Sequence, residues 1–114
     1  MDNCLFCKII KGEIPSTKVY EDDFTYAFMD IHPQAKVHVL VVSKQHIDDV
    51  AHHAALSDQA LAACLRATAK VAEAMGVAET GYRVVTNCGR DACQSVGHLH
   101  LHVLGGEKLS ERMV

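Results

Sequence analysis

Apolar and polar positions follow a strand-like pattern in both halves of the chain and a helical pattern in between. Short segments of alternating or continuous apolar residues, bounded by turn-forming residues, are typical of β-strands. Five such segments occur, at residues 18–20, 24–29, 37–43, 82–87 and 98–104. Residues 88–97 form a polar loop that leads into the last of them. The pattern therefore predicts five strands.

A long helix is predicted between the third and fourth strands. Apolar residues recur three and four positions apart over residues 61–75, Ser57 is a suitable N-cap, and Gly76 is a natural stop. Residues 5–11 predict a second, short helix, which a following glycine ends. Because the early connections are short, we expect an α+β fold in which a mostly antiparallel sheet carries its helices on one face.

The most informative segment is the last predicted strand, in which His98, His100 and His102 alternate with aliphatic residues. Side chains two positions apart share one face of a strand, so the pattern places three imidazoles in a row. Three interpretations follow: solvated histidines, a metal site, or an imidazole nucleophile whose second nitrogen is held by a hydrogen bond. The chain has no HExxH motif and no clear carboxylate partner to complete a catalytic metal site.

The loop before this strand favours nucleophilic catalysis. Asn87, Gly89, Gln94, Ser95 and Gly97 offer side-chain and main-chain donors next to the imidazoles. Such donors suit an oxyanion, for example a phosphoryl group. The chain contains neither a GxxxxGK[ST] nor a GxGxxG motif, so we expect the phosphate of a mononucleotide or an ester.

Composition limits the remaining options. The chain has 114 residues, which predicts a single domain over residues 1–114, and its net charge is −3 with scattered lysines and arginines. We therefore expect no nucleic-acid partner. A histidine interrupts the longest apolar stretch, at residues 37–42, so we expect no membrane partner. An odd number of cysteines, five, and the lack of a secretory signal at the N-terminus predict a cytoplasmic protein.

Three segments of the chain resemble the histidine triad (HIT) family, and specifically its Hint branch. The segments are residues 94–106 (QSVGHLHLHVLGG), 6–15 (FCKIIKGEIP) and 30–42 (DIHPQAKVHVLVV). His102 separates the chain from the branches of the family that have glutamine at this position. The resemblance implies a five-stranded antiparallel sheet with one long and one short helix, and a homodimer in which two sheets join into one of ten strands.

The resemblance also implies an activity, that of a purine nucleoside phosphoramidase. Such an enzyme hydrolyses the P–N bond of adenosine or guanosine 5′-phosphoramidates, acts on aminoacyl adenylates, and needs no cofactor for catalysis. By position, His100 is the nucleophile that forms a nucleotidyl-histidine, and His102 donates to a phosphate oxygen. His98 and His38 complete the hydrogen-bond relay that orients His100, and Ser95 contacts the scissile nitrogen or a phosphate oxygen. We expect a histidine of ordinary pKa, about 6.5, to help protonate the leaving amine.

The implied ligand is a purine nucleoside monophosphate derivative of the AMP or GMP type. Asp30 would hold its ribose hydroxyls, Asn87 its phosphate end, and apolar residues its base. The full implied nucleotide-binding set is Leu5, Phe6, Ile9, Phe28, Asp30, Ile31, Leu40, Asn87, Cys93, Ser95, Val96, His100 and His102. Its apolar members would be buried in a core without any ligand as well, and an isolated histidine such as His38 is often a core residue. Cys93 departs from the Hint pattern, which usually has glycine there, so its side chain could narrow the site or alter the loop.

Cys4 and Cys7 form a CxxC pair that has three interpretations: a redox pair, a chance spacing, or half of a zinc site. A structural zinc ion needs four ligands, and His46 and His98 are the candidates for the other two. Some HIT relatives bind zinc through this combination, so structural zinc is a candidate cofactor. Two further functions stay open, a nucleotide-binding scaffold or regulatory module with incidental catalysis, and a zinc-dependent hydrolase.

Overall fold

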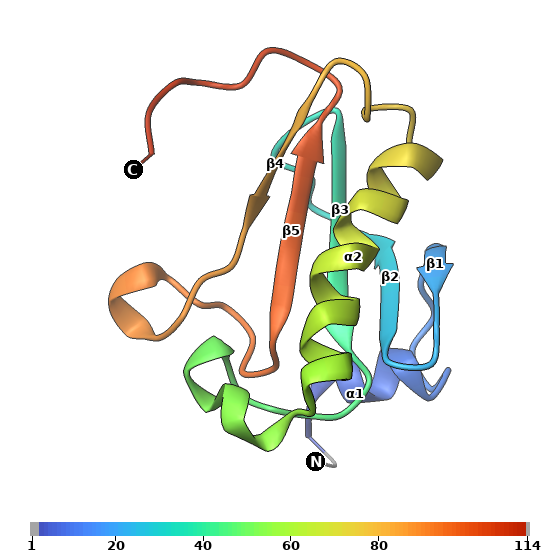
Figure 1. Cartoon of the computed structure of the whole chain (residues 1–114), viewed down its shortest axis with the longest axis vertical. Coiled ribbons are helices and arrows are strands. Elements are labelled where there is room, and N and C mark those ends of the chain that lie inside the picture. Colours follow the sequence, from blue (N-terminus) through green and yellow to red (C-terminus); the bar gives the residue numbers. More distant parts are fainter. Residues whose placement is uncertain (1–2, 114) are drawn as a thin grey trace.

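The computed structural model describes residues 3–113, so residues 1, 2 and 114 of the predicted domain lie outside the described residues. Its elements in chain order are α1 (Leu5–Ile10), β1 (Lys18–Glu21), β2 (Thr25–Met29), β3 (Val37–Ser43), η1 (Val50–Ala55), α2 (Asp58–Ala74), β4 (Tyr82–Val85), η2 (Arg90–Ala92) and β5 (His100–Gly105). The strands form one antiparallel sheet in the order β1-β2-β3-β5-β4 (Figure 1). The prediction of a five-stranded antiparallel sheet with one long and one short helix is confirmed. The two 3-10 helices, η1 and η2, were not predicted.

The central strand, β3, is buried on both of its faces. Val39 and Val41 pack with α2 in one apolar cluster, whereas Leu40 and Val42 pack with α1 in another. His38 lies on the same face as Leu40, because side chains alternate along a strand, and it is only 4% exposed. A nearly continuous apolar sequence is typical of a strand with both faces covered, and this explains the run at residues 37–42.

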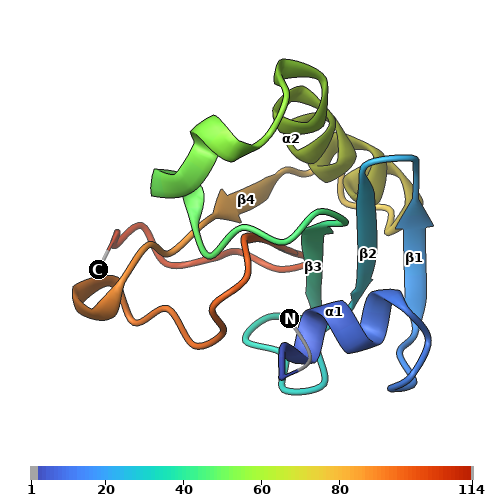
Figure 2. The ribbon, with the colours of Figure 1, turned by 90° about the horizontal axis from the view of Figure 1, so that it is seen from below.

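The two α-helices lie on opposite faces of the sheet, so the prediction of helices on one face is wrong. Figure 2 shows α2 on one side of the strands and α1 on the other. The reason is that Phe6 and Ile9 of α1 bury their side chains against Phe28 of β2 and the α1-facing residues of β3. The short helix thus forms a wall on the face of the sheet that carries His38.

Helix α2 begins and ends where its sequence predicts. The hydroxyl of Ser57 accepts a hydrogen bond from the main-chain N–H of Ala60, at 3.1 Å, and so caps the helix. At the other end Gly76 takes a φ of +73°, which glycine adopts without the steric cost that a side chain brings. The helix buries its face of small residues, among them Ala67 and Val71, against the sheet.

The last strand begins at His100, two residues later than predicted. The N–H of His98 donates to the carbonyl of Val96 in a turn, and the N–H of Leu99 donates to Ile47 in the segment after β3. These main-chain bonds hold residues 98 and 99 outside the ladder, whose last pair joins His100 to Val42. His98 is therefore free to point away from the row that alternation predicted.

Strand β4 is the edge strand next to β5, and its Tyr82 and Val84 side chains are exposed.

No helix among residues 3–113 is both long enough and apolar enough to cross a membrane.

Candidate active site

The three histidines of the alternating segment divide into two groups. His100 and His102 lie on β5, and His102 meets His38 of the neighbouring β3. The imidazole of His98 instead lies with Cys4, Cys7 and His46, on the side of α1 and the segment after β3. The predicted relay of His98 and His38 around His100 therefore takes a different form. His38 contacts His102, and His98 acts on His100 through its main chain.

Hydrogen bonds fix the protonation of the His38–His102 pair. The main-chain N–H of Gln34 donates to Nδ1 of His38, at 3.0 Å. A neutral imidazole has one donor and one acceptor, so Nε2 of His38 carries the proton. That Nε2–H donates to Nδ1 of His102, at 2.9 Å. By the same rule, Nε2 of His102 carries a proton and is left as a donor.

A separate bond fixes the opposite tautomer in His100. Its Nδ1 lies 2.6 Å from the main-chain carbonyl of His98, which can only accept, so Nδ1 carries the proton. Nε2 of His100 is therefore an unprotonated nitrogen with its lone pair available. The ring of Phe6 packs edge-on against that of His100, with centroids 5.1 Å apart. The His100 ring is thus held by a hydrogen bond on one side and by an aromatic ring on another.

Burial keeps the pair neutral near pH 7. Burial, followed by the nearby His100 and His38, lowers the pKa of His102 to about 4. Burial also lowers the pKa of His38, although the carboxylate of Asp30, 3.4 Å from its Nε2, acts in the opposite direction. His102 therefore does not have the ordinary pKa expected of a histidine that protonates the leaving group. In the free protein it is a neutral donor.

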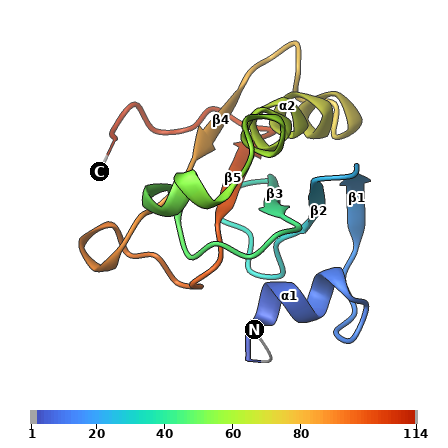
Figure 3. The ribbon, with the colours of Figure 1, turned by 60° about the horizontal axis from the view of Figure 1, so that its bottom comes forward.

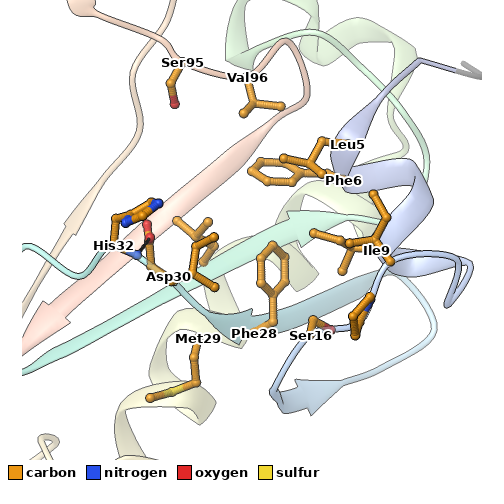
Figure 4. Close-up of a pocket in the computed structure, with 14 residues that line it drawn as sticks. Leu5, Phe6, Ile9, Ser16, Phe28, Met29, Asp30, His32, Ser95 and Val96 are labelled. Atoms are coloured by element: carbon orange, nitrogen blue, oxygen red, sulfur yellow. Dashed lines mark hydrogen bonds between the residues drawn. The ribbon is translucent and has the colours of Figure 1, made fainter.

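An apolar cavity of about 280 Å³ lies beside these histidines, between α1, β2 and the end of the polar loop. Nine of the predicted nucleotide-binding residues line it: Leu5, Phe6, Ile9, Phe28, Asp30, Ile31, Leu40, Ser95 and Val96. Figure 4 shows Asp30 and His32 on one side of the cavity, Ser95 beside Val96 above them, and Leu5, Phe6 and Ile9 on the other side. An apolar cavity with a few polar groups at one end is typical of a site for a small ligand with one polar part.

His100 and His102 adjoin this cavity without lining it. Phe6, which lines the cavity, contacts His100, and Leu40, which also lines it, pairs with His102 across the two strands. The predicted contacts of Asn87 and Cys93 also lie outside the lining. The carboxamide of Asn87 instead donates to the carbonyl of Ala92, 2.8 Å away within the loop.

Cys93 shows why glycine is common at its position. Its φ is +60°, which makes it the one non-glycine residue among residues 3–113 with a left-handed backbone. A side chain in that conformation is strained by its own backbone, whereas glycine is not. The Cys93 side chain is exposed and does not line the cavity, so it does not narrow it.

Sequence reasoning missed five residues that line the cavity: Ile14, Pro15, Ser16, Met29 and His32. Four of them directly extend predicted segments, because Ile14 and Pro15 follow the short helix and Met29 and His32 flank the predicted residues Asp30 and Ile31. Adjacency in the sequence could have found these four. The main-chain N–H of Gln34 sets the tautomer of His38. Every residue except proline has such an N–H, so the residue type at position 34 could not have predicted this contact.

The second cluster consists of Cys4, Cys7, His46 and His98, and its ligand atoms all lie within 4.8 Å of one another. Nδ1 of His98 lies 3.3 Å from Sγ of Cys4 and 3.6 Å from Sγ of Cys7, and Nδ1 of His46 lies 3.4 Å from Sγ of Cys7. The two Nδ1 atoms are 3.1 Å apart. The edges of a tetrahedral zinc site with two sulfur and two nitrogen ligands measure about 3.3–3.8 Å. The four measured separations, 3.1–3.6 Å, are close to these edges, so the donors are near enough to one another to share a tetrahedral zinc ion.

The outer contacts of this cluster also suit a metal ion. Nε2 of His98 lies 2.7 Å from the carbonyl of Ser43, and Nε2 of His46 lies 2.9 Å from the carboxylate of Asp48. Both partners are acceptors, so each Nε2 carries a proton and each Nδ1 presents a lone pair to the centre of the cluster. Two lone pairs facing each other are stable only with a cation or a proton between them. The residues thus fit a structural zinc ion.

Asp30, His38 and His102 are a third group with ligand atoms close together. They suit a metal poorly, because Nδ1 of His38 already accepts a main-chain N–H and its Nε2 must then carry the proton. A metal ligand at that Nε2 would leave the imidazole with no proton on either nitrogen. The metal interpretation of the histidine row is therefore disfavoured for His38 and His102.

Comparison with known proteins agrees with this geometry. The family model of the HIT domain matches residues 11–109. The chain belongs to the HIT family. A purine nucleoside phosphoramidase of Escherichia coli is 44% identical to this HIT protein over 108 residues, which cover 95% of the chain and 91% of the relative.

Solved structures of HIT proteins share the fold. A HIT family hydrolase from Clostridium thermocellum is 47% identical, with a TM-score of 0.92 over 100% of this chain and 99% of its own. A histidine triad nucleotide-binding protein from Candida albicans is 36% identical, with a TM-score of 0.82 over 98% of this chain and 87% of its own. The resemblance noted in the sequence is thereby confirmed, and hydrolases are among the relatives of this HIT protein.

Proposed function

We propose that this HIT protein is a purine nucleoside phosphoramidase. One observation carries the proposal, the complementary tautomers of His100 and His102. His100 offers an unprotonated Nε2 as a nucleophile, and His102 offers an Nε2–H as a donor, on one strand face beside an apolar cavity. The Escherichia coli relative, named as such an enzyme, supports the same assignment.

The cavity suggests how a nucleoside 5′-phosphoramidate binds. The base would lie among Phe28, Ile9 and the other apolar side chains, and the carboxylate of Asp30 would accept hydrogen bonds from the ribose hydroxyls. This orientation places the phosphate at the end of the cavity near Ser95, next to the triad. We assign Asn87 and Cys93 to the conformation of the loop that presents Ser95, since neither side chain lines the cavity.

The reaction then follows from the two tautomers. Nε2 of His100 attacks the phosphorus, a P–N(histidine) bond forms, and the scissile P–N bond breaks as the amine leaves with an added proton. Nε2–H of His102 donates to a phosphate oxygen and stabilises the developing charge. Both nitrogens of His102 are committed, Nδ1 as the acceptor from His38 and Nε2 as the donor to phosphate, so the proton that the leaving amine gains comes from solvent. Water next attacks the nucleotidyl-histidine, loses a proton to solvent, releases the nucleoside monophosphate and restores His100.

The direct test is incubation of the protein with adenosine 5′-phosphoramidate. We expect release of AMP and ammonia, and an adenylyl group on His100 that can be trapped by rapid denaturation at alkaline pH, where the P–N(histidine) bond is stable, and located by mass spectrometry. Turnover without any covalent adduct would contradict the mechanism. Tight binding of AMP with no turnover of phosphoramidates or aminoacyl adenylates would favour the nucleotide-binding scaffold instead.

We further propose that Cys4, Cys7, His46 and His98 hold a structural zinc ion. Bound there, zinc would join α1 to the segment after β3 and to the residue pair before β5. It would have no open position for a substrate, because all four ligands come from the protein. A zinc-dependent hydrolase is therefore disfavoured. The thiolates require a reducing compartment, which agrees with the proposed cytoplasmic location. Metal analysis of protein purified without chelator tests the site, and less than ~0.2 zinc per chain would refute it.

The proposed homodimer would form along the edge strand β4. Tyr82 and Val84 are exposed there, and an unpaired edge with apolar side chains is suited to pairing with a second copy. Light scattering on the eluted protein should give twice the mass of one chain. A purely monomeric protein at micromolar concentration would contradict the ten-stranded sheet.

A further inference from the structure

Gln94 makes three hydrogen bonds with its carboxamide, which uses both N–H donors and the oxygen. The oxygen accepts from the main-chain N–H of Gly89, at 2.9 Å. The nitrogen donates to the carbonyl of Asp48, at 2.7 Å, and to the carbonyl of Val96, at 2.9 Å. Only one orientation of the amide satisfies these partners, because one is a donor and two are acceptors. The side chain is thus held in place rather than extended toward a ligand.

The loop that contains Gln94 is closed on itself. Asn87 donates to Ala92, Cys93 donates to Arg90, and the N–H of Gln94 donates to Gly89. Residues 87–95 bond to one another and to Val96. Among residues 3–113, the bond from Gln94 to Asp48 is the one hydrogen bond that joins them to any other part of the chain. The loop therefore behaves as a compact unit with a single polar attachment.

The attachment point is a well-anchored segment. Figure 3 shows this segment after β3 (green) running beside the chain that leads into β5 (orange to red). Ile47 is buried and its carbonyl accepts from Leu99, while His46 reaches the cluster that contains the His98 imidazole. The carbonyl of His98 in turn holds Nδ1 of His100. The same segment thus fixes the nucleophile and, through Gln94, the loop.

We propose that Gln94 is a positioning residue, which holds Ser95 at a fixed place relative to His100. The inference rests on the proposed phosphoramidase activity, in which Ser95 contacts the scissile nitrogen or a phosphate oxygen. Ser95 is the next residue after Gln94, it lines the cavity, and its hydroxyl has no hydrogen-bond partner among residues 3–113. The position of the Ser95 hydroxyl therefore depends on the main chain on either side of Ser95. The Gln94 side chain bonds to Gly89 on one side and to Val96 on the other.

The first test is the variant Gln94→Glu, which keeps the shape and the acceptor for Gly89 but loses both donors. Its carboxylate would face two carbonyl oxygens and would release the loop from Asp48. We expect kcat for adenosine 5′-phosphoramidate to fall about 10–100-fold with little change in KM, since a displacement of about 1 Å costs on this scale. The matched control is Gln45→Glu, whose amide donates to the carbonyl of Ala55 away from the triad, and which should keep the kcat of the unaltered protein.

A double-mutant cycle with Ser95→Ala separates positioning from general loosening. If Gln94 acts through Ser95, Gln94→Glu should change kcat less than about threefold once the Ser95 hydroxyl is absent. An equal fall in kcat in both backgrounds, or no fall in either, would overturn the inference. If Gln94→Glu does not fold, Gln94→Asn, which keeps the amide but shortens the reach, takes its place in the cycle. Absence of turnover in the unaltered protein would instead refute the proposed function, on which the inference depends.

Discussion

This HIT protein has two pairs of neighbouring imidazoles, His38–His102 and His46–His98, which differ in the protonation of the nitrogens that face each other. In His38 and His102 a proton on one nitrogen meets a lone pair on the other, 2.9 Å away. In His46 and His98 two lone pairs face each other across 3.1 Å. The difference comes from the second nitrogen of each ring, which accepts a main-chain N–H in His38 but donates to a carbonyl in His98. The same residue type thus presents a proton to its neighbour in one place and a lone pair in the other.

His98 connects the two regions through different atoms. Its imidazole belongs to the zinc-type cluster of Cys4, Cys7, His46 and His98, while its carbonyl fixes the tautomer of His100, the proposed nucleophile. The comparison predicts that changes in one region mainly affect chemistry and that changes in the other mainly affect metal binding and stability.

The largest effect is expected at His100. His100→Gly removes the nucleophile but leaves the apolar cavity and Asp30 in place, so kcat should fall by several orders of magnitude while AMP still binds. Steady-state kinetics and calorimetric titration with AMP measure the two properties. His53→Ala, an exposed histidine outside both clusters, is the control and should keep full activity. Turnover of His100→Gly within about tenfold of the unaltered protein would contradict the assignment.

The second prediction concerns the zinc-type cluster. Cys7→Ala removes one of its four ligands, so bound zinc should be lost and the free energy of unfolding should fall by several kcal/mol, because metal binding contributes to folding. Metal analysis and urea unfolding measure the change. Cys64→Ala is the matched control, since this thiol is also buried but belongs to α2, where it packs against apolar side chains and is none of the four ligands. Full zinc content in Cys7→Ala would show that the cluster is not the metal site.

The third prediction uses acid to disrupt the donor–acceptor pair. The folded pKa of His102 is lowered to about 4, so as pH falls below about 6.5 the unfolded chain takes up a proton that the folded protein refuses. Stability from this residue is therefore complete above pH 6.5 and lost as pH falls toward 4. Between pH 7 and pH 5 the unaltered protein should lose about 2 kcal/mol more than His102→Gln, which has no group to titrate there.

Urea unfolding of both proteins at the two pH values, with equal zinc, measures this difference. Because His38 and His98 also have a lowered pKa and occur in both proteins, their contribution cancels in the comparison. An equal loss of stability in the two proteins would show that His102 is not held neutral by its surroundings.

Much of the fold was predictable because its apolar pattern is local. The five strands, the short helix and the N-cap at Ser57 all follow from spacing and from single residue types. The side of the sheet that α1 covers was not predictable in the same way. It depends on Phe6 and Ile9 finding Phe28, a contact between segments that are distant in the sequence.

The site was predictable in membership but not in arrangement. Alternation placed His98 in one row with His100 and His102, but main-chain bonds of residues 98 and 99 to Val96 and Ile47 turn its ring elsewhere. The tautomers were also hidden, because they depend on main-chain groups of Gln34 and His98 rather than on side chains. Residue types therefore identify which imidazoles gather, and the partners of their second nitrogens decide what each one does.

The smallest effect is expected at Asp48, the hydrogen-bond partner of the second ring nitrogen of His46. Each cluster has an aspartate beside an Nε2 atom, Asp48 at 2.9 Å from His46 and Asp30 at 3.4 Å from His38. Asp48→Asn keeps the main-chain carbonyl that Gln94 uses but removes the charge that orients His46 and strengthens its basicity. Loss of such a partner typically weakens metal affinity 10–100-fold, and the Asp48 side chain is 62% exposed, so we expect a value near the lower end. Competition with a zinc chelator measures the affinity. Asp30→Asn should leave the zinc affinity unchanged, because this carboxylate faces His38, whose two ring nitrogens are both occupied by hydrogen bonds. Equal losses of zinc affinity in the two variants would mean that net charge, rather than the hydrogen bond to Nε2 of His46, governs metal binding.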